Sequence, residues 1–309
     1  MIHYRRLILA VSLLLVSVPL HAQIAIHDDR VFPESITSTP EGVIFIGSES
    51  KGEVLRAEKD SDAAEVWIKP GTAGLQRVLG VLADTASQTL WVCSSRSADS
   101  AEPTALKAFD LISGTPKASY AFPGGAGLCN DIAVSGDGTT YVSDTTSSRV
   151  LRLRKGGNAL DVWASGQHLE GIDGIAIGAN GAVYVNTIST GKILRIPLAK
   201  NGAAASFEEM KLSQPLQGPD GMRSLGPNMF VVAEGRANRL AIITIQKDEA
   251  KVEVVKEGLL GITAVTRVGN VLWVNDAKFR MMRDAGQDPG AFTLQSVPLP
   301  QAANASERH

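Results

Sequence analysis

The sequence predicts an all-β protein, a six-bladed β-propeller with four antiparallel strands in each blade. Two observations lead to this prediction: a two-strand pattern recurs along the chain, and helical periodicity is almost absent. In each copy a short strand opens on a polar or small residue, a turn follows, and a second strand ends on a polar residue. The copies lie at 34–48, 80–94, 130–144, 173–187, 220–234 and 263–276, so their opening positions are 46, 50, 43, 47 and 43 residues apart. A repeat of this length built from paired strands is typical of propeller blades.

Both ends of the chain are predicted to lie outside the propeller. Arg5 and Arg6 precede an apolar run at 7–20, and Ala22 ends a small-residue cleavage site, which is the pattern of a signal peptide over residues 1–22. We therefore expect a periplasmic or secreted protein, with an uncleaved N-terminal anchor as the alternative. One propeller domain is expected over 23–300, followed by a polar, disordered tail at 301–309.

The remaining strands of each blade follow the two-strand pattern. Third strands are expected at 53–56, 149–153, 192–196 and 238–243, and weaker fourth strands at 65–68, 160–163, 252–255 and 292–294. Residues 23–31 have strand character and are expected to close the ring as the outer strand of the last blade. One turn of helix is expected within 203–210.

Charge and motifs exclude several classes of function. The formal net charge is −2 and no basic run occurs, so neither nucleic acid nor, after signal cleavage, a membrane surface is an expected partner. No Gly-x-Ser-x-Gly elbow and no phosphate-binding glycine loop is present. The sequence does not define an oligomeric state.

Cys93 and Cys129 are the only cysteines. They fall in neighbouring repeats on the same expected face, and an oxidising compartment allows a disulfide between them. Two buried free thiols are the alternative. No Cys-x-x-Cys spacing supports a redox or metal role.

The opening residues of the repeats predict a ring of oxygen ligands. Strand one of each blade lines the axis of a propeller, so Glu34, Asn130, Asp173 and Asp220 are expected to converge there, while Gly80 and Thr263 drop out of the set. Three neighbouring carboxylates repel one another unless a proton or a cation neutralises them. Oxygen-only donors suit a hard divalent ion, and we expect Ca²⁺, with Mg²⁺, Mn²⁺ or Zn²⁺ as alternatives. The competing interpretation is that Asp-Gly and Asn-Asp pairs simply form turns.

These residues resemble a known family, the SMP-30/gluconolactonase/LRE-like six-bladed propellers, which are related to paraoxonases and drug-responsive lactonases. The resemblance rests on the Pro-Asp-Gly-Met phrase ending at Met222, on the Asn130-Asp131 pair and on the position of Glu34. It implies that Glu34, Asn130, Asp173 and Asp220 are the metal ligands.

The chain departs from the family pattern at two positions. Asp173 stands where the family usually has Asn, which adds a negative charge. Leu128 stands where gluconolactonase-type members carry an Arg that contacts sugar hydroxyls, so a more apolar lactone or ester becomes a reasonable substrate.

The resemblance also implies roles for single residues. The metal would polarise a lactone carbonyl, and Asp220 would activate water, with Asp173 as the rival base. Asn130 would contact metal and substrate. His168 and Asp144 are further candidates for substrate binding. Asp144 belongs to a second set of polar residues that end strand two, for which the expected role is to satisfy loop backbone groups; this set is Ser48, Ser94, Asp144, Thr187, Glu234 and Asp276.

The leading functional hypothesis is therefore a divalent-metal-dependent hydrolase acting on a small lactone or ester. The rival hypothesis is a non-catalytic, NHL-like propeller that binds a ligand or a protein, because a propeller fold alone does not imply catalysis. A binding propeller has no need of acidic residues at equivalent axial positions, so the ring distinguishes the two.

Overall fold

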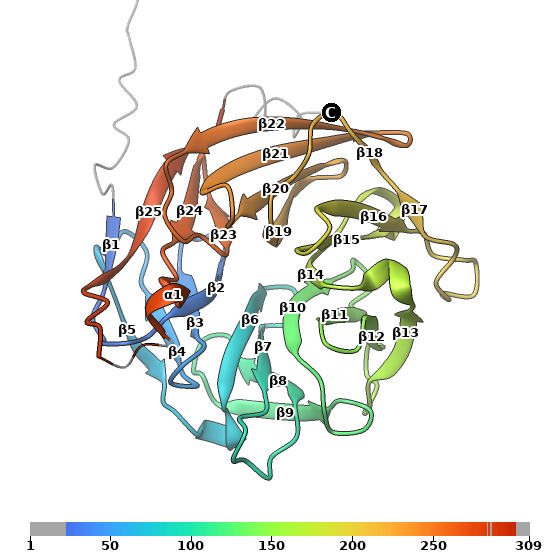
Figure 1. Ribbon diagram of the computed structural model, residues 1–309. Coiled ribbons are helices and arrows are strands. Elements are labelled where there is room, and N and C mark those ends of the chain that lie inside the picture. Colours follow the sequence, from blue (N-terminus) through green and yellow to red (C-terminus); the bar gives the residue numbers. More distant parts are fainter. Residues whose placement is uncertain (1–22, 283, 285, 301–309) are drawn as a thin grey trace, which may run out of the picture.

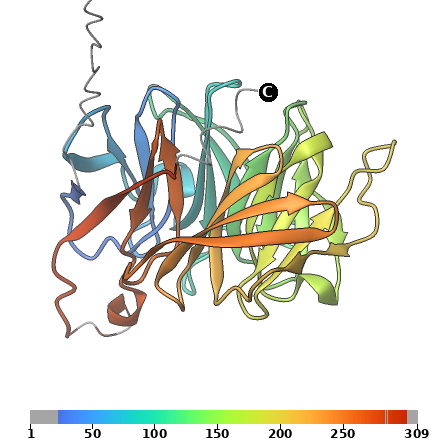
Figure 2. The same cartoon turned by 90° about the horizontal axis from the view of Figure 1, so that it is seen from above.

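A computed structural model describes residues 23–282, 284 and 286–300. The predicted signal peptide at 1–22 and the predicted tail at 301–309 lie outside the described residues. The described chain forms six twisted blades around a central axis, and the first and last blades are joined into one eight-stranded sheet (Figure 1). Viewed from the side, the ring is a thick disc with loops gathered on its two faces (Figure 2). The fold class predicted from the sequence is confirmed.

Each blade is a four-stranded meander whose first strand lies nearest the axis. Blade 1 contains β2 (Pro33–Ser38), β3 (Ile44–Ser48), β4 (Val54–Ala57) and β5 (Ala63–Ile68). Blade 2 contains β6 (Arg77–Asp84), β7 (Thr89–Ser95), β8 (Ala105–Asp110) and β9 (Pro116–Ala121). Blade 3 contains β10 (Cys129–Val134), β11 (Thr140–Asp144), β12 (Arg149–Leu153) and β13 (Asp161–Ser165).

The second half of the ring repeats this plan. Blade 4 contains β14 (Ile172–Ile177), β15 (Val183–Thr187), β16 (Lys192–Ile196) and β17 (Glu208–Glu209). Blade 5 contains β19 (Pro219–Gly226), β20 (Met229–Glu234), β21 (Arg239–Gln246) and β22 (Glu249–Glu257), with β18 (Lys211–Leu212) added at its outer edge. Blade 6 contains β23 (Val265–Val268), β24 (Val271–Asn275), β25 (Phe292–Pro298) and β1 (Gln23–Ile26).

The N-terminal strand closes the ring, as predicted. β1 pairs antiparallel with β25, Gln23 opposite Gln295, and also pairs in parallel with β5 of blade 1. The prediction that 292–294 forms a fourth strand is wrong: β25 lies between β24 and β1 and is the third strand of blade 6. The fourth place belongs to β1 because the chain begins inside this blade.

The predicted helical turn at 203–210 is also wrong. Glu208 and Glu209 instead pair with Arg195 and Leu194 as the short outer strand of blade 4. The helical segments among the described residues are short: η1 (Thr72–Gly74), η2 (Gln167–Leu169), η3 (Ala179–Gly181) and α1 (Phe279–Met282). None of the described helices is long and apolar enough to cross a membrane.

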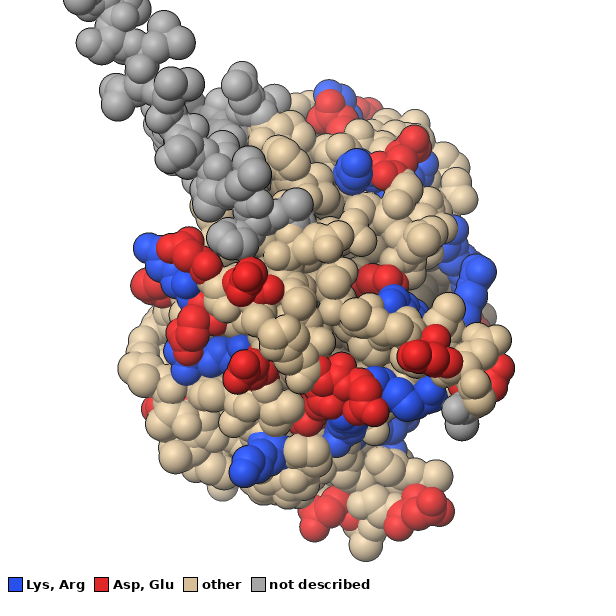
Figure 3. All heavy atoms as spheres, turned by 90° about the vertical axis from the view of Figure 1, so that its left-hand side faces the viewer, with Lys and Arg blue, Asp and Glu red and all other residues tan. Residues whose placement is uncertain are grey.

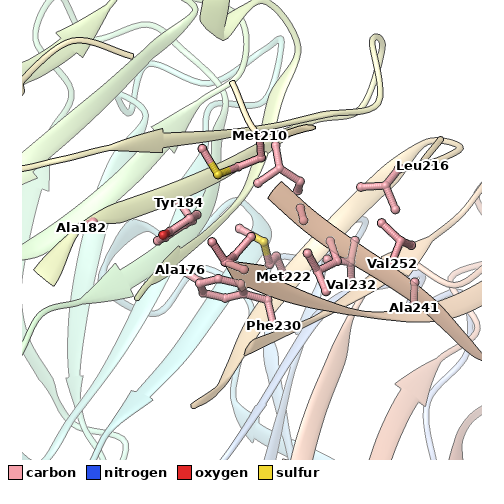
Figure 4. Packing of buried hydrophobic residues seen from close by; sticks show 14 residues of the cluster. Ala176, Ala182, Tyr184, Met210, Leu216, Met222, Phe230, Val232, Ala241 and Val252 are labelled. Atoms are coloured by element: carbon pink, nitrogen blue, oxygen red, sulfur yellow. The ribbon is translucent and has the colours of Figure 1, made fainter. Parts of the chain in front are cut away.

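The hydrophobic core is divided among the interfaces between blades. Six clusters of buried side chains each join two neighbouring sheets. Figure 4 shows the cluster between blades 4 and 5, where the rings of Tyr184 and Phe230 lie 4.7 Å apart and Met222 fills the space beside them. Burying one such side chain stabilises the fold by about 1.5–3 kcal/mol, so the stacked blades hold one another in place.

The two cysteines form a disulfide between Cys93 of β7 and Cys129 of β10. The bond joins blades 2 and 3. Of the two alternatives that the sequence left open, the structure has the disulfide and not the free thiols. Cys129 directly precedes Asn130, so the cross-link also fixes the start of the inner strand of blade 3.

Charges on the outer surface are mixed in sign. On the side formed by blades 6 and 1, acidic and basic side chains lie next to one another without a large patch of one sign (Figure 3). This arrangement gives no footprint for a polyanionic partner on that side.

Candidate metal centre

A repeated irregularity of the inner strands positions the predicted ligands. In blades 1, 3, 4 and 5 the pairing of strand one with strand two breaks between Pro33 and Ile36, Cys129 and Ile132, Ile172 and Ile175, and Pro219 and Met222. Two residues of strand one there oppose one residue of strand two, which is a β-bulge and redirects side chains. Glu34, Asn130, Asp173 and Asp220 are each the first residue inside this bulge. The structure therefore brings the four predicted residues to equivalent positions.

The position of the bulge changes which residue of blade 2 is equivalent to the four predicted ligands. The break there lies between Val78 and Val81, so the residue equivalent to the four ligands is Leu79 rather than Gly80. Leu79 is buried and apolar. In blade 6 Thr263 precedes β23, and its hydroxyl donates to the backbone oxygen of Glu34 at 2.5 Å. Blades 2 and 6 contribute no carboxylate to the ring, as the sequence indicated.

The Asp-Gly pairs are parts of strands and not turns. A side chain built at Gly174 would place its Cβ 2.5 Å from the carbonyl oxygen of Asp220, and one at Gly221 would place it 2.8 Å from the carbonyl oxygen of Thr263. Glycine is therefore needed here because the next blade approaches closely. The turn interpretation of these pairs is wrong.

The four ring residues are nearly buried, with exposures of 8% for Glu34, 5% for Asn130, 5% for Asp173 and 9% for Asp220. Asn130 Nδ2 donates to Asp173 Oδ2 at 3.0 Å and to Thr145 Oγ1 at 2.9 Å. This fixes the amide, and no hydrogen bond among the described residues uses its Oδ1. Asp173 Oδ1 is buried and has no hydrogen-bond partner within the described chain.

Burial and the charges of neighbouring carboxylates raise the pKa of all three ring carboxyls. Loss of hydration is the main cause for each. The pKa of Asp173 is raised to about 7, with the charge of Asp131 as the next cause. Burial and the charges of Asp173 and Glu34 raise the pKa of Asp220 well above its usual value, and burial and the charge of Asp173 do the same for Glu34.

These observations test whether a cation fits the ring. Buried carboxyls that resist ionisation, an unpaired carboxylate oxygen and a fixed amide oxygen form a donor set suited to a hard divalent ion. As the side chains lie, however, no three His, Cys, Asp or Glu residues of the described chain form a metal-binding cluster. Asn130 and Asp173 are the two ring residues joined directly, by the hydrogen bond from the amide to the carboxylate. The donor chemistry of the ring residues fits a cation.

Two buried asparagines, which were not among the residues predicted from the sequence, hold the backbone of the ring residues through hydrogen bonds. Asn186 accepts from the backbone N–H of Gly174 and donates to the carbonyl oxygen of Asp220 at 2.6 Å. Asn275 accepts from the N–H groups of Thr263 and Ala264 and donates to the carbonyl oxygen of Glu34 at 3.3 Å. Each asparagine is the residue before the polar end of strand two, and this shared position was the available signal.

A buried ion pair lies beneath the ring. Arg223 of β19 donates from Nη1 to both carboxylate oxygens of Asp131 in blade 3, at 2.9 and 2.8 Å. Its Nη2 donates to Ser35 Oγ in blade 1 at 3.2 Å and to the carbonyl oxygen of Val81 in blade 2 at 3.4 Å. One side chain from blade 5 thus reaches three other blades across the axis. The sequence does not reveal the role of Arg223 because its partners lie in other blades, far away along the chain.

The second polar set mainly serves the loops. Asp144 is fully buried, accepts from the N–H of Leu128 at 3.0 Å and pairs with Arg149 at 2.8 Å. Glu234 accepts from the N–H of Gln217 and pairs with Arg239 at 2.9 Å. For Asp144 these contacts favour the loop-supporting role over substrate binding.

His168 lies in η2, which leads into the start of β14 and hence to the ring face. Its side chain is exposed, and its ring packs against Phe207 at 5.7 Å. Among the described residues, no hydrogen bond, ion pair or ring contact joins His168 to the four ring residues. Its role in substrate binding stays a prediction.

Comparisons with solved structures find a similar fold in several distantly related proteins. A gluconolactonase from Xanthomonas campestris matches with a TM-score of 0.62 at 15% identity, over 91% of this chain and 92% of that chain. A virginiamycin B lyase from Staphylococcus aureus matches with a TM-score of 0.59 at 13% identity, over 90% and 98% of the two chains. A chain of a nidogen–laminin complex matches with a TM-score of 0.59 at 14% identity, over 84% and 94%.

No protein-family model and no curated protein sequence matches the chain. At these identities the similar structures establish the class of fold, a six-bladed β-propeller like that of gluconolactonases, and leave the chemistry to the residues of this chain.

Proposed function

We propose that this protein is a divalent-metal-dependent hydrolase of small lactones or related esters. The observation that carries the proposal is the set of three buried carboxyls and one amide at the same bulge position of four blades, with Asp173 Oδ1 unpaired. The fold shared with a gluconolactonase supports the same class of reaction.

Glu34, Asn130, Asp173 and Asp220 would hold the ion, most naturally Ca²⁺ because all donors are oxygen atoms. When bound, such an ion supplies Lewis-acid polarisation of a carbonyl oxygen. The carboxyls of this chain would then be held ionised, because a cation reverses the repulsion that otherwise raises their pKa.

Asp220 is the proposed base. Burial and the nearby charge of Asp173 raise the pKa of Asp220, which would favour transfer of a proton from an attacking water to its carboxylate. Asn130, fixed by Thr145 and Asp173, would orient the substrate through its free amide oxygen. Leu128, two residues before Asn130, adds no charge or hydrogen-bonding side chain for a sugar hydroxyl, which favours lactones with apolar substituents.

The cross-blade disulfide supports the proposal that the protein works in an oxidising compartment, in the periplasm or outside the cell. A small molecule is the proposed partner, since the ring residues are buried and leave no broad surface for a macromolecule.

The deciding experiment measures hydrolysis of a panel of aliphatic, aromatic and sugar-acid lactones by the mature protein before and after chelation. We expect activity to be lost with chelator and restored by Ca²⁺. Asp220→Asn should keep an oxygen at the ring but lower kcat/KM by at least about 100-fold, the usual contribution of a general base. Asp248→Asn, which removes an exposed carboxylate paired with Lys211, is the matched control.

Two results would contradict the proposal. Absence of calcium binding by calorimetry would remove the metal site. Calcium binding without hydrolysis of any lactone or ester in the panel would instead favour the non-catalytic binding propeller.

A further inference from the structure

A cavity of about 680 Å³ lies at the opposite end of the inner strands from the ring. Its wall includes residues 132–134 of β10, 175–177 of β14 and 222–224 of β19, which follow the ring residues along the same strands. It extends outward between blades 2 and 3. We call it the distal cavity. Glu34, Asn130, Asp173 and Asp220 do not line it, so it is a site separate from the ring.

The distal cavity has the size and the apolar wall of a small-molecule site. Trp91 and Tyr120 line it with their rings 6.2 Å apart, and Leu82, Ile132 and Leu153 add aliphatic surface. Pockets of 300–1,000 Å³ with such walls typically hold drug-sized molecules. Trp91 is 9% exposed and packs in the cluster between blades 2 and 3, and it also lines the cavity.

Basic groups outnumber acidic groups in this wall. Its charged residues are Arg154, Lys155, Arg223 and Asp84. Asp84 is satisfied by its own turn, accepting from the N–H of Ala86 and the hydroxyl of Ser87. Arg223 is paired with Asp131, and Arg154 lies 3.9 Å from Asp161. Lys155 is exposed and has no partner among the described residues, which leaves its charge available to a ligand.

Polar atoms without partners concentrate in the same wall. The described chain has six buried side-chain polar atoms that lack a hydrogen bond. Three of them, Trp91 Nε1, Thr140 Oγ1 and Arg223 Nε, belong to residues that line the distal cavity. Trp91 and Thr140 are themselves more than nine-tenths buried. Unpaired buried donors are costly in a finished core and are common where a ligand or water completes the bonding.

We propose that the distal cavity binds a small organic anion with a flat apolar body, of the aromatic carboxylate or sulfonate class. The apolar body lies against Trp91 and Tyr120, and the anionic group is held by Lys155 and Arg154 at the rim. This site does not depend on the metal ring or on the proposed hydrolase activity.

The test uses two fluorescent probes that share their aromatic rings and differ by one sulfonate, 1-anilinonaphthalene-8-sulfonate and N-phenyl-1-naphthylamine. We expect the sulfonate to bind saturably, with one molecule per chain, and at least tenfold more tightly than the neutral probe. Lys155→Glu should weaken its binding at least tenfold. Lys200→Glu makes the same charge change at an exposed lysine of the neighbouring blade, outside the cavity wall, and should leave binding unchanged.

Asp220→Asn separates this site from the ring, and sulfonate binding should be unaffected by it. The proposal is overturned if the sulfonate does not saturate at one site, if Lys155→Glu and Lys200→Glu behave alike, or if the neutral probe binds as tightly. Both lysines are exposed, so these variants are expected to fold.

Discussion

The two ends of the propeller axis differ although the same inner strands build both. At the ring end, bulges turn Glu34, Asp173 and Asp220 toward one another, and the carboxyls are buried and short of partners. At the distal end the inner strands of blades 2, 3 and 4 pair regularly, many of the side chains are apolar or small, and the charged groups are mainly basic. Arg223 and Asp131 lie between the two ends.

This difference shows that interruption of strand pairing creates the ring positions, whereas the residue type at each bulge decides whether the blade adds a polar group, since the bulge of blade 2 carries Leu79. Two residues inside each bulge escape the strict alternation of a strand, so an acidic side chain can point to the axis while its neighbours pack between blades. Where alternation is kept, Ile132, Ile175 and Met222 pack into the apolar clusters between neighbouring blades. One strand thus offers two chemically opposite ends.

The largest expected effect comes from the residue between the two ends. Arg223→Met leaves the Asp131 carboxylate buried without its main partner, and such unpaired buried charges cost about 3–5 kcal/mol. Urea unfolding of the purified protein measures this loss. The double variant Arg223→Met, Asp131→Asn should recover part of it, since no unpaired charge remains; equal stability of the single variant and the parent would contradict the role given to the pair.

Removal of the disulfide should loosen the ring end more than the distal end. Replacing Cys93 and Cys129 by Ala is expected to cost about 2–4 kcal/mol, because a cross-link over 36 residues restricts the unfolded chain. Hydrogen exchange should then accelerate more at the amides of 129–131 than at those of 132–134. Uniform acceleration along β10 would show that the bond does not act locally.

The ring and the distal cavity should respond to different variants. Asp220→Asn is expected to lower kcat/KM for a lactone by at least about 100-fold, or about 2.7 kcal/mol, without changing sulfonate binding. Lys155→Glu should do the reverse. If either variant alters both properties to a similar degree, the two ends are one site.

The smallest effect concerns the metal-free ring. The pKa of Asp173 is raised to about 7, so the folded state binds this proton more tightly than the unfolded state does. The protonated Asp173 carboxyl contributes fully to the free energy of unfolding below about pH 4, and this contribution is lost as the pH rises through about 7. In chelated protein at pH 8, Asp173→Asn should therefore be more stable by about 1 kcal/mol, or about 2–4 °C in Tm.

The advantage of Asp173→Asn should disappear at pH 4.5, where the carboxyl is protonated, and should reverse when Ca²⁺ is present. A variant less stable than the parent at pH 8 without metal would contradict the repulsion inferred for the ring.

The architecture could be predicted from the sequence because the same two-strand pattern recurs in all six blades. It could not show that Leu79 rather than Gly80 is the ring position of blade 2, because a bulge shifts the register by one residue without leaving a motif. It also could not show that β25 is a third strand, since β1 is separated from it by the whole length of the domain.

The ring residues were predictable for the same reason, while their neighbours were not. Arg223, Asn186 and Asn275 act across blades, and nothing in their own repeats marks their partners. The distal cavity likewise depends on side chains from blades 2, 3, 4 and 5 that share no sequence pattern.

Closure of the ring by β1 has a consequence for the association of molecules. β1 covers the outer edges of both β25 and β5, so a chain shortened past Ile26 would present two unpaired strand edges side by side. Open edges of this kind accept strands from other chains. The four residues of β1 therefore protect the propeller from association with other chains through its open strand edges.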